Sequence, residues 1–202
     1  MEYHRIEIFL LDMYTEENPH HKIISFKLEK NDYLEHLLYS ASKTSSVQQK
    51  RRRNKIILPI IYLGIGIFGI IQGNLFMVIS MIIMASLWLY FFPSWEKKQY
   101  IKQFNQYLDT NLKDELDKEI KLDFSPKEII QIEKNQKFHI TYDQLRGWYE
   151  TGTAVYIGLL DGYTIIIPKN NEKEIEDVKS IVFNNERNIP IQETLDLNWK
   201  WE

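Results

Sequence analysis

The hydropathy pattern is dominated by one long apolar stretch. Residues 56–92 contain no Asp, Glu, Lys, Arg or His, although 26% of the whole chain is charged. One crossing of a bilayer needs about 20 apolar helical residues, so this stretch is too long for a single span. Its only cluster of polar and turn-forming residues is Gln72, Gly73 and Asn74. The pattern predicts two membrane-spanning helices, residues 56–71 and 75–92, joined by a tight turn.

Basic residues flank the apolar stretch on both sides, whereas the turn carries no charge. Lys50, Arg51, Arg52, Arg53 and Lys55 precede it, and Lys97 and Lys98 follow it. Lysine and arginine beside a span favour the cytoplasmic side of a membrane. We therefore expect a membrane-anchoring basic flank, a lipid bilayer as partner, and both termini in the cytosol.

Two other interpretations of these segments are less favoured. The basic run could be a nucleic-acid or localisation patch, but residues 96–202 carry 15 basic and 20 acidic residues, so we expect no nucleic-acid partner. The apolar stretch could be the buried hairpin of a soluble protein. A chain of 202 residues forms one or two modest domains, which could not easily enclose it.

The segments beside the apolar stretch show strand and helix patterns. Strands are predicted at residues 5–11 and 22–28, with Glu17-Asn18-Pro19 as a turn between them. Asn31 is predicted to cap a helix that ends before a polar lead at residues 42–49. Pro93-Ser94 is predicted to end the second span and to begin a new amphipathic helix, residues 95–118. That helix should pack on the N-terminal helix or on a second copy, so a homo-oligomer is possible.

The C-terminal half is predicted to be rich in short strands. The expected strands are residues 120–124, 128–133, 137–142, 145–150, 154–160 and 163–168. Asp161-Gly162 predicts a two-residue hairpin turn, and Asn171 predicts the cap of a final helix with Glu174 completing a capping box. This order favours a small antiparallel barrel with a C-terminal helix. No regular structure is predicted after residue 187.

The predicted fold is thus an α+β membrane protein in five segments. Residues 1–49 supply strands and a helix, residues 50–95 the two-span hairpin, residues 96–119 a juxtamembrane helix, residues 120–187 the β-rich domain, and residues 188–202 a tail.

Three segments resemble the YcxB-like family of bacterial membrane proteins. They are residues 24–33 (ISFKLEKNDY), the hairpin behind its basic flank, and residues 140–150 (ITYDQLRGWYE) followed by Val155-Tyr156-Ile157 and residues 165–169 (IIIPK). The resemblance implies a cytosolic β domain similar to pleckstrin-homology-like domains, tethered to the bacterial cytoplasmic (inner) membrane as a multi-pass protein. It implies no catalytic residues. The first 20 residues and the tail after Asn185 depart from the family pattern.

The sequence contains no motif that is typical of an enzyme active site. The five histidines show no metal-ligand spacing, there are no cysteines, and no glycine-rich phosphate loop is present, so we expect no catalytic residue, metal or cofactor. Gly64, Gly66 and Gly69 lie in the first span, where small residues permit close helix packing. Trp148, Glu150 and Tyr156 are candidates for partner binding, although a core tryptophan with a salt-bridged glutamate is the favoured alternative.

Two functions fit these expectations. The first is a non-enzymatic membrane protein whose cytosolic domain binds or regulates an unknown protein partner at the membrane. The alternative is an immunity protein that neutralises a membrane-acting antibacterial toxin, in which case the hairpin itself would be the binding surface.

Overall fold

The computed structural model describes residues 21–113, 116, 118–133, 136–183 and 190–201, and these residues form two compact units. The β unit contains the described residues of Met1–Leu28 and Asp117–Asn198, and the helical unit contains those of Glu29–Leu116 and Trp199–Glu202. The helical unit is therefore inserted into the sequence of the β unit. The predicted strand 5–11 and the turn at residues 17–19 lie outside the described residues.

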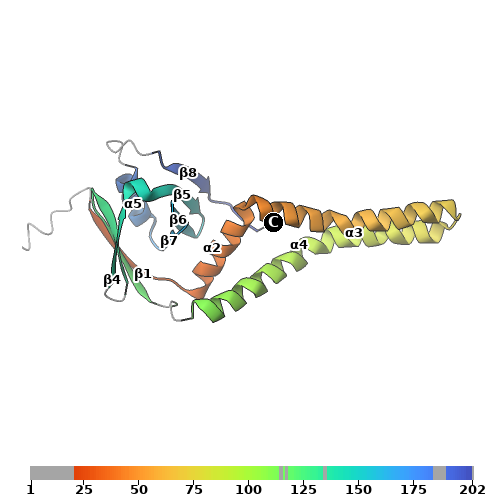
Figure 1. Cartoon of the computed structure of the whole chain (residues 1–202), viewed down its shortest axis with the longest axis horizontal. Coiled ribbons are helices and arrows are strands. Elements are labelled where there is room, and N and C mark those ends of the chain that lie inside the picture. Colours follow the sequence, from red (N-terminus) through yellow and green to blue (C-terminus); the bar gives the residue numbers. More distant parts are fainter. Residues whose placement is uncertain (1–20, 114–115, 117, 134–135, 184–189, 202) are drawn as a thin grey trace, which may run out of the picture. The chain divides into compact units, whose positions relative to one another are not determined.

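The helical unit is built from α2 (Lys30–Lys43), α3 (Ser45–Ile71) and α4 (Leu75–Asn111). Figure 1 shows α3 and α4 as a long antiparallel hairpin, and the predicted turn between Ile71 and Leu75 is confirmed. Gly73 has φ 66°, a conformation that glycine adopts without strain. The Asn74 side chain accepts a hydrogen bond from the Met77 N–H at 3.0 Å and so caps α4.

Both hairpin helices extend beyond the predicted spans. Residues 50–55 of the basic flank lie within α3, which begins at Ser45, and α4 runs through Pro93 and Lys97-Lys98 to Asn111. The predicted break at Pro93 is wrong. Aromatic rings on both sides of it pack together: Trp88 lies 5.3 Å from Phe92 and 6.1 Å from Trp95 between ring centroids. A proline inside a helix removes one backbone hydrogen bond, and here the rings of Trp88 and Trp95 bridge the two sides of Pro93.

The start of α2 also differs from the prediction. Glu29, not Asn31, is the N-cap residue, and Asp32 completes a capping box by accepting a hydrogen bond from the Glu29 N–H at 2.7 Å. An acidic residue in the first turn also favours the helix dipole.

The hairpin helices are both long and apolar enough to cross a membrane. Only 17% of the most apolar window of α3 and 11% of that of α4 are buried. Large apolar side chains such as Ile60, Ile71 and Phe76 are more than half exposed. A core hairpin of a soluble protein would bury these surfaces, so this exposure argues against that alternative.

The β unit holds two four-stranded sheets. The first has the order β1 (Lys22–Lys27), β2 (Glu119–Phe124), β3 (Glu128–Glu133), β4 (Gln136–Thr141), all antiparallel. The second has the order β7 (Thr164–Pro168), β6 (Ala154–Leu159), β5 (Leu145–Thr151), β8 (Gln192–Asp196). The strands predicted within residues 120–168 are found with their ends shifted by at most one residue.

Two strands lie outside the predicted boundaries of the β-rich domain. β1 pairs with β2 although 91 residues separate Lys27 from Glu119, and β8 pairs with β5 in parallel. The boundaries at residues 120 and 187 are therefore too narrow, and the tail does contain a strand. Local patterns miss both pairings, because a partner strand distant in sequence leaves no signal near the strand itself.

The turn and the helix near the end of the β unit follow the sequence with two corrections. Leu159 N–H donates to the Tyr163 carbonyl at 2.8 Å, so the β6–β7 loop has three residues, 160–162, rather than two. Gly162, with φ 93°, occupies the left-handed position that such loops need. Asn171 caps α5 (Glu172–Val182) as predicted, by accepting from the Lys173 N–H at 3.1 Å, but without the capping box.

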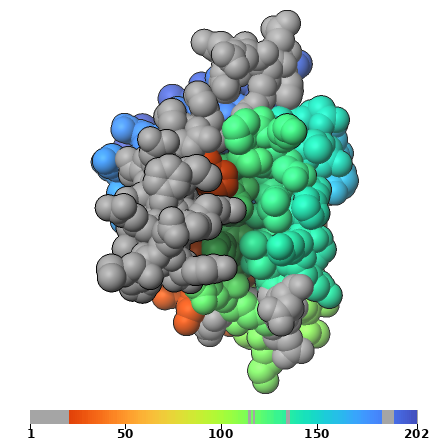
Figure 2. All heavy atoms as spheres, turned by 90° about the vertical axis from the view of Figure 1, so that its left-hand side faces the viewer, coloured from red at the N-terminus to blue at the C-terminus, as the bar shows by residue number. Residues whose placement is uncertain are grey.

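The core of the β unit is made by apolar side chains from both sheets and α5. Leu122, Phe124, Ile129, Val155, Ile157 and Val178 are fully buried. Strand β4 is an edge strand and is largely exposed, with Phe138 48% exposed. Figure 2 shows the green to teal atoms of β2–β4 across a broad open face of this unit.

Candidate functional site

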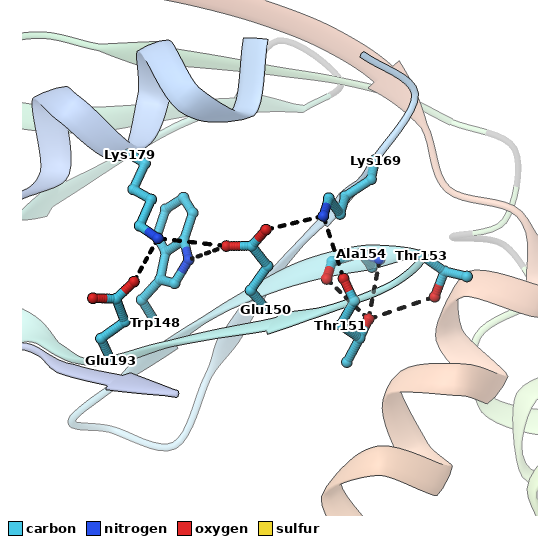
Figure 3. A network of polar contacts seen from close by, with 8 residues as sticks. All are labelled: Trp148, Glu150, Thr151, Thr153, Ala154, Lys169, Lys179 and Glu193. Carbon is cyan, nitrogen blue, oxygen red and sulfur yellow. Dashed lines mark hydrogen bonds and ion pairs between the residues drawn. The ribbon is translucent and has the colours of Figure 1, made fainter. Parts of the chain in front are cut away.

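A network of polar contacts surrounds Glu150 on β5 (Figure 3). Its Oε1 accepts a hydrogen bond from Lys169 Nζ at 2.9 Å, just after β7. Its Oε2 accepts one from the indole Nε1 of Trp148 at 3.3 Å and lies 3.7 Å from Lys179 Nζ on α5. Lys179 also pairs with Glu193 on β8. One carboxylate therefore ties β5 to the end of β7 and to α5, and Lys179 extends the link to β8.

Neighbouring groups of opposite charge shift the pKa values of Glu150 and Lys179. Burial alone would raise the pKa of Glu150, but hydrogen bonds from Lys169 and Trp148 and the charges of Lys169 and Lys179 bring that pKa below its ordinary value. Burial would lower the pKa of Lys179, but its hydrogen bond and charge interaction with Glu193, and the charge of Glu150, raise that pKa. Two lysines face two glutamates, so the cluster is neutral at pH 7.

A second group of hydrogen bonds joins β5 to β6 at their connecting turn, beside this cluster. The buried Thr151 hydroxyl accepts from the Ala154 N–H at 3.1 Å and donates to the Ala154 carbonyl at 3.0 Å. Lys169 Nζ lies 3.5 Å from the Thr151 carbonyl oxygen, so the same lysine serves both groups. The residues of Figure 3 thus connect β5 and β6 to the end of β7, to α5 and to β8. Each charge already has a partner, and none is left over for a ligand.

The three candidate partner-binding residues do not form one patch. Trp148 is fully buried and packs edge-on against Phe183, with ring centroids 5.8 Å apart. Tyr156 is 2% exposed and pairs with Tyr149, so it lies on the opposite face of the sheet from Trp148 and Glu150. The arrangement matches the alternative of a core tryptophan beside a salt-bridged glutamate.

The described part of the chain contains no candidate metal site. Within these residues, no group of three or more His, Asp or Glu side chains is placed to hold a metal ion. Among the described histidines, His21 lies 2.8 Å from Asp123 Oδ1, His139 lies 3.1 Å from Glu128 Oε2, and His36 lies 3.4 Å from the Ser40 hydroxyl.

The basic flank lies on the helical unit at the base of the hairpin. Arg51 is the inward-facing member: its Nε lies 2.9 Å from Oε2 of the buried Glu96, and its guanidinium lies 4.2 Å from the Trp201 ring centroid. The remaining members are exposed: Lys50, Arg52, Arg53, Lys55, Lys97 and Lys98. The structure therefore divides the flank into one packed arginine and six solvent-facing cations.

The three glycines of α3 lie in two different environments. Gly66 and Gly69 are buried against α4, where a Cβ atom on Gly69 would lie 3.3 Å from Met77 and Val78. A Cβ atom on Gly64 would meet nothing within 4 Å. Gly66 and Gly69 thus allow the two hairpin helices to pack together, and only Gly64 faces outward.

The C-terminal tryptophans form a contact cluster that the sequence prediction missed. Trp199 packs edge-on against Tyr39 and donates to the Ser42 hydroxyl at 3.1 Å, while Trp201 packs on Tyr100 at 4.9 Å between ring centroids. This Trp-x-Trp segment joins α2, α3 and α4. The two tryptophans are evident in the sequence, but the helices against which they pack are not.

No family model, no curated protein and no solved structure matches the chain. The resemblance to the YcxB-like family therefore stays a prediction.

Proposed function

We propose that this chain is a non-enzymatic integral membrane protein whose hairpin tethers the β unit to the cytosolic face of a bacterial inner membrane, where the β unit binds or regulates a protein partner. The observation that carries the proposal is the exposure of the hairpin. Two helices expose most of their large apolar side chains, while the β unit buries a complete core of its own. Apolar surface of this extent is stable in lipid and would aggregate in water.

The charge distribution supports the proposed orientation. All six exposed cations of the flank lie at the base of the hairpin, and the turn at residues 72–74 has none. Basic residues are retained on the cytosolic side during insertion. The β unit, whose strands precede and follow the hairpin in sequence, would then lie in the cytosol.

The β unit fits a binding role better than a catalytic one. Its polar cluster is neutral and internally paired, and it fixes strands and helix to one another. Its element order of two antiparallel meanders followed by a helix supports our proposal of a pleckstrin-homology-like, YcxB-like domain. An exposed edge strand such as β4 is a surface to which another chain can add.

A hairpin exchange tests the tether. Residues 56–92 are replaced by an unrelated two-span hairpin of equal length, and partners are recovered by cross-linking in native membranes. Recovery of the same partner by the native and exchanged proteins supports a tether that leaves binding to the β unit. Loss of the partner, with membrane insertion intact, would move the binding surface into the bilayer. The immunity alternative predicts that second outcome.

Resistance to alkaline carbonate extraction is the control for both proteins in this exchange. A native chain released from membranes by carbonate would contradict the proposal at its first step.

A further inference from the structure

The exposed cations of the basic flank form a ring at one level of the hairpin. The Arg51–Glu96 ion pair places residue 51 of α3 beside residue 96 of α4. Trp88 Nε1 donates to the Lys55 carbonyl at 3.2 Å, a second contact that joins the antiparallel helices four residues further along α3. Lys50, Arg52 and Arg53 on α3 therefore lie at the height of Lys97 and Lys98 on α4.

The ring surrounds the helices rather than occupying one face. Successive helical residues are rotated by about 100°, so Lys50, Arg52 and Arg53 point to different sides of α3. Arg51 points toward α4 and is occupied by Glu96. None of the six exposed cations pairs with an acidic side chain among the residues that the structure describes. We call Lys50, Arg52, Arg53, Lys55, Lys97 and Lys98 the basic collar.

The described acids of the helical unit that lie outside the Arg51–Glu96 pair belong to the α2 region and to the far end of α4. They are Glu29, Asp32, Glu35 and Asp109. Lys30 pairs with Asp109 at 2.6 Å, which ties the start of α2 to the far end of α4. Asp109 lies 11 residues beyond Lys98, about 16 Å along the helix. This is about twice the Debye length in physiological salt, so the collar charge is not neutralised from there.

The collar lies where the exposed apolar surface begins. Ile56 and Ile57 follow Lys55 directly and are 40% and 51% exposed, while Tyr90 and Trp95 place exposed aromatic rings near the same level. Aromatic rings of this kind prefer the headgroup layer of a bilayer, and long basic side chains can reach from the edge of the apolar region to the phosphates.

We infer that the basic collar binds the phosphate headgroups of anionic phospholipids in the cytosolic leaflet. The inference rests on the proposed membrane anchoring and adds a lipid class to it. Six cations that pair with no acid among the described residues, beside an apolar surface, match a negatively charged headgroup layer in both charge and height. A zwitterionic headgroup offers no net charge to such a ring.

The test uses the full-length chain purified in a neutral detergent. Phosphatidylglycerol or phosphatidylcholine is added at equal concentrations, and bound lipids are counted by native mass spectrometry. The test variant carries Lys50→Gln, Arg52→Gln and Arg53→Gln. The matched control carries Lys121→Gln, Lys127→Gln and Lys137→Gln, which remove the same charge from exposed positions of the β unit.

The native chain and the control should bind phosphatidylglycerol at least tenfold more tightly than phosphatidylcholine. The collar variant should lose most of this preference, because each cation near an anionic surface contributes about fivefold in affinity. Equal binding of both lipids by the native chain, or an equal loss in both variants, would overturn the inference. Displacement of phosphatidylglycerol by millimolar inorganic phosphate would instead assign a free-anion site. Carbonate extraction of the collar variant reports separately on membrane anchoring.

Discussion

Replacing Trp148 by alanine tests the structure of the β unit most severely. The indole is fully buried, packs edge-on against Phe183, and donates a hydrogen bond to Glu150. A buried tryptophan removes about 200 Å² or more from water, worth roughly 5 kcal/mol at about 25 cal/mol per Å². Alanine retains part of this term and leaves a cavity, so we expect a loss of about 3–5 kcal/mol in the free energy of unfolding.

The assay is urea unfolding of the full-length protein in neutral detergent, followed by the β-sheet circular dichroism signal. With a slope of about 1–3 kcal/mol per molar urea, the midpoint should fall by more than about 1 M. Phe138→Ala is the matched control, because that ring lies in the same unit and is 48% exposed. It should change stability by about 1 kcal/mol or less. A Trp148→Ala protein within about 0.5 kcal/mol of the native one would refute the core assignment and revive a binding role for this residue.

Three further predictions concern other parts of the molecule. Gly69→Leu should destabilise the hairpin by about 1–3 kcal/mol through overpacking against Met77 and Val78. Gly64→Leu should leave the thermal unfolding of the hairpin in detergent unchanged. Equal effects of the two substitutions would contradict the placement of Gly69 against α4 and of Gly64 on the outer surface. The pKa of Glu150 is depressed from 4.5, so its stabilisation is present above pH 4.5 and is lost as pH falls through the folded pKa. Between pH 6 and pH 3 the urea midpoint should therefore fall less in the Glu150→Gln protein than in the native protein. An equal fall in both proteins would contradict this prediction. Trp201→Ala should cost the helical unit about 3 kcal/mol in helical circular dichroism melts, while Lys200→Ala at the exposed neighbour should stay within about 0.5 kcal/mol.

Local sequence patterns predicted the elements better than their assembly. The alternation of Ile24, Phe26 and Leu28 predicted β1, and the polar cluster at residues 72–74 predicted the hairpin turn, because each signal lies within the element that it specifies. The pairing of β1 with β2 and the parallel addition of β8 depend on distant partners, which no local pattern encodes.

The site residues show the same difference between local patterns, which the sequence predicts, and contacts between distant segments, which it does not. Sequence spacing placed Trp148 and Glu150 on one face of a strand, but the register of β5 with β6 puts Tyr156 on the other. Lys169, Lys179 and Glu193 were not candidates, since three elements bring them to Glu150. Pro93 misled the helix prediction because the packing of Trp88, Phe92 and Trp95 overrides a local breaker.

Cysteine accessibility in intact cells tests the central claim most directly, since the chain contains no native cysteine. Single cysteines are placed at Gln72 in the hairpin turn, at Ser46 near the start of α3, and at Lys127 between β2 and β3, all of them exposed. A membrane-impermeant thiol reagent should label the cysteine at position 72 and leave positions 46 and 127 protected until the cells are opened. Labelling of position 127 from outside, or protection of all three, would contradict a hairpin that crosses the membrane with the β unit in the cytosol.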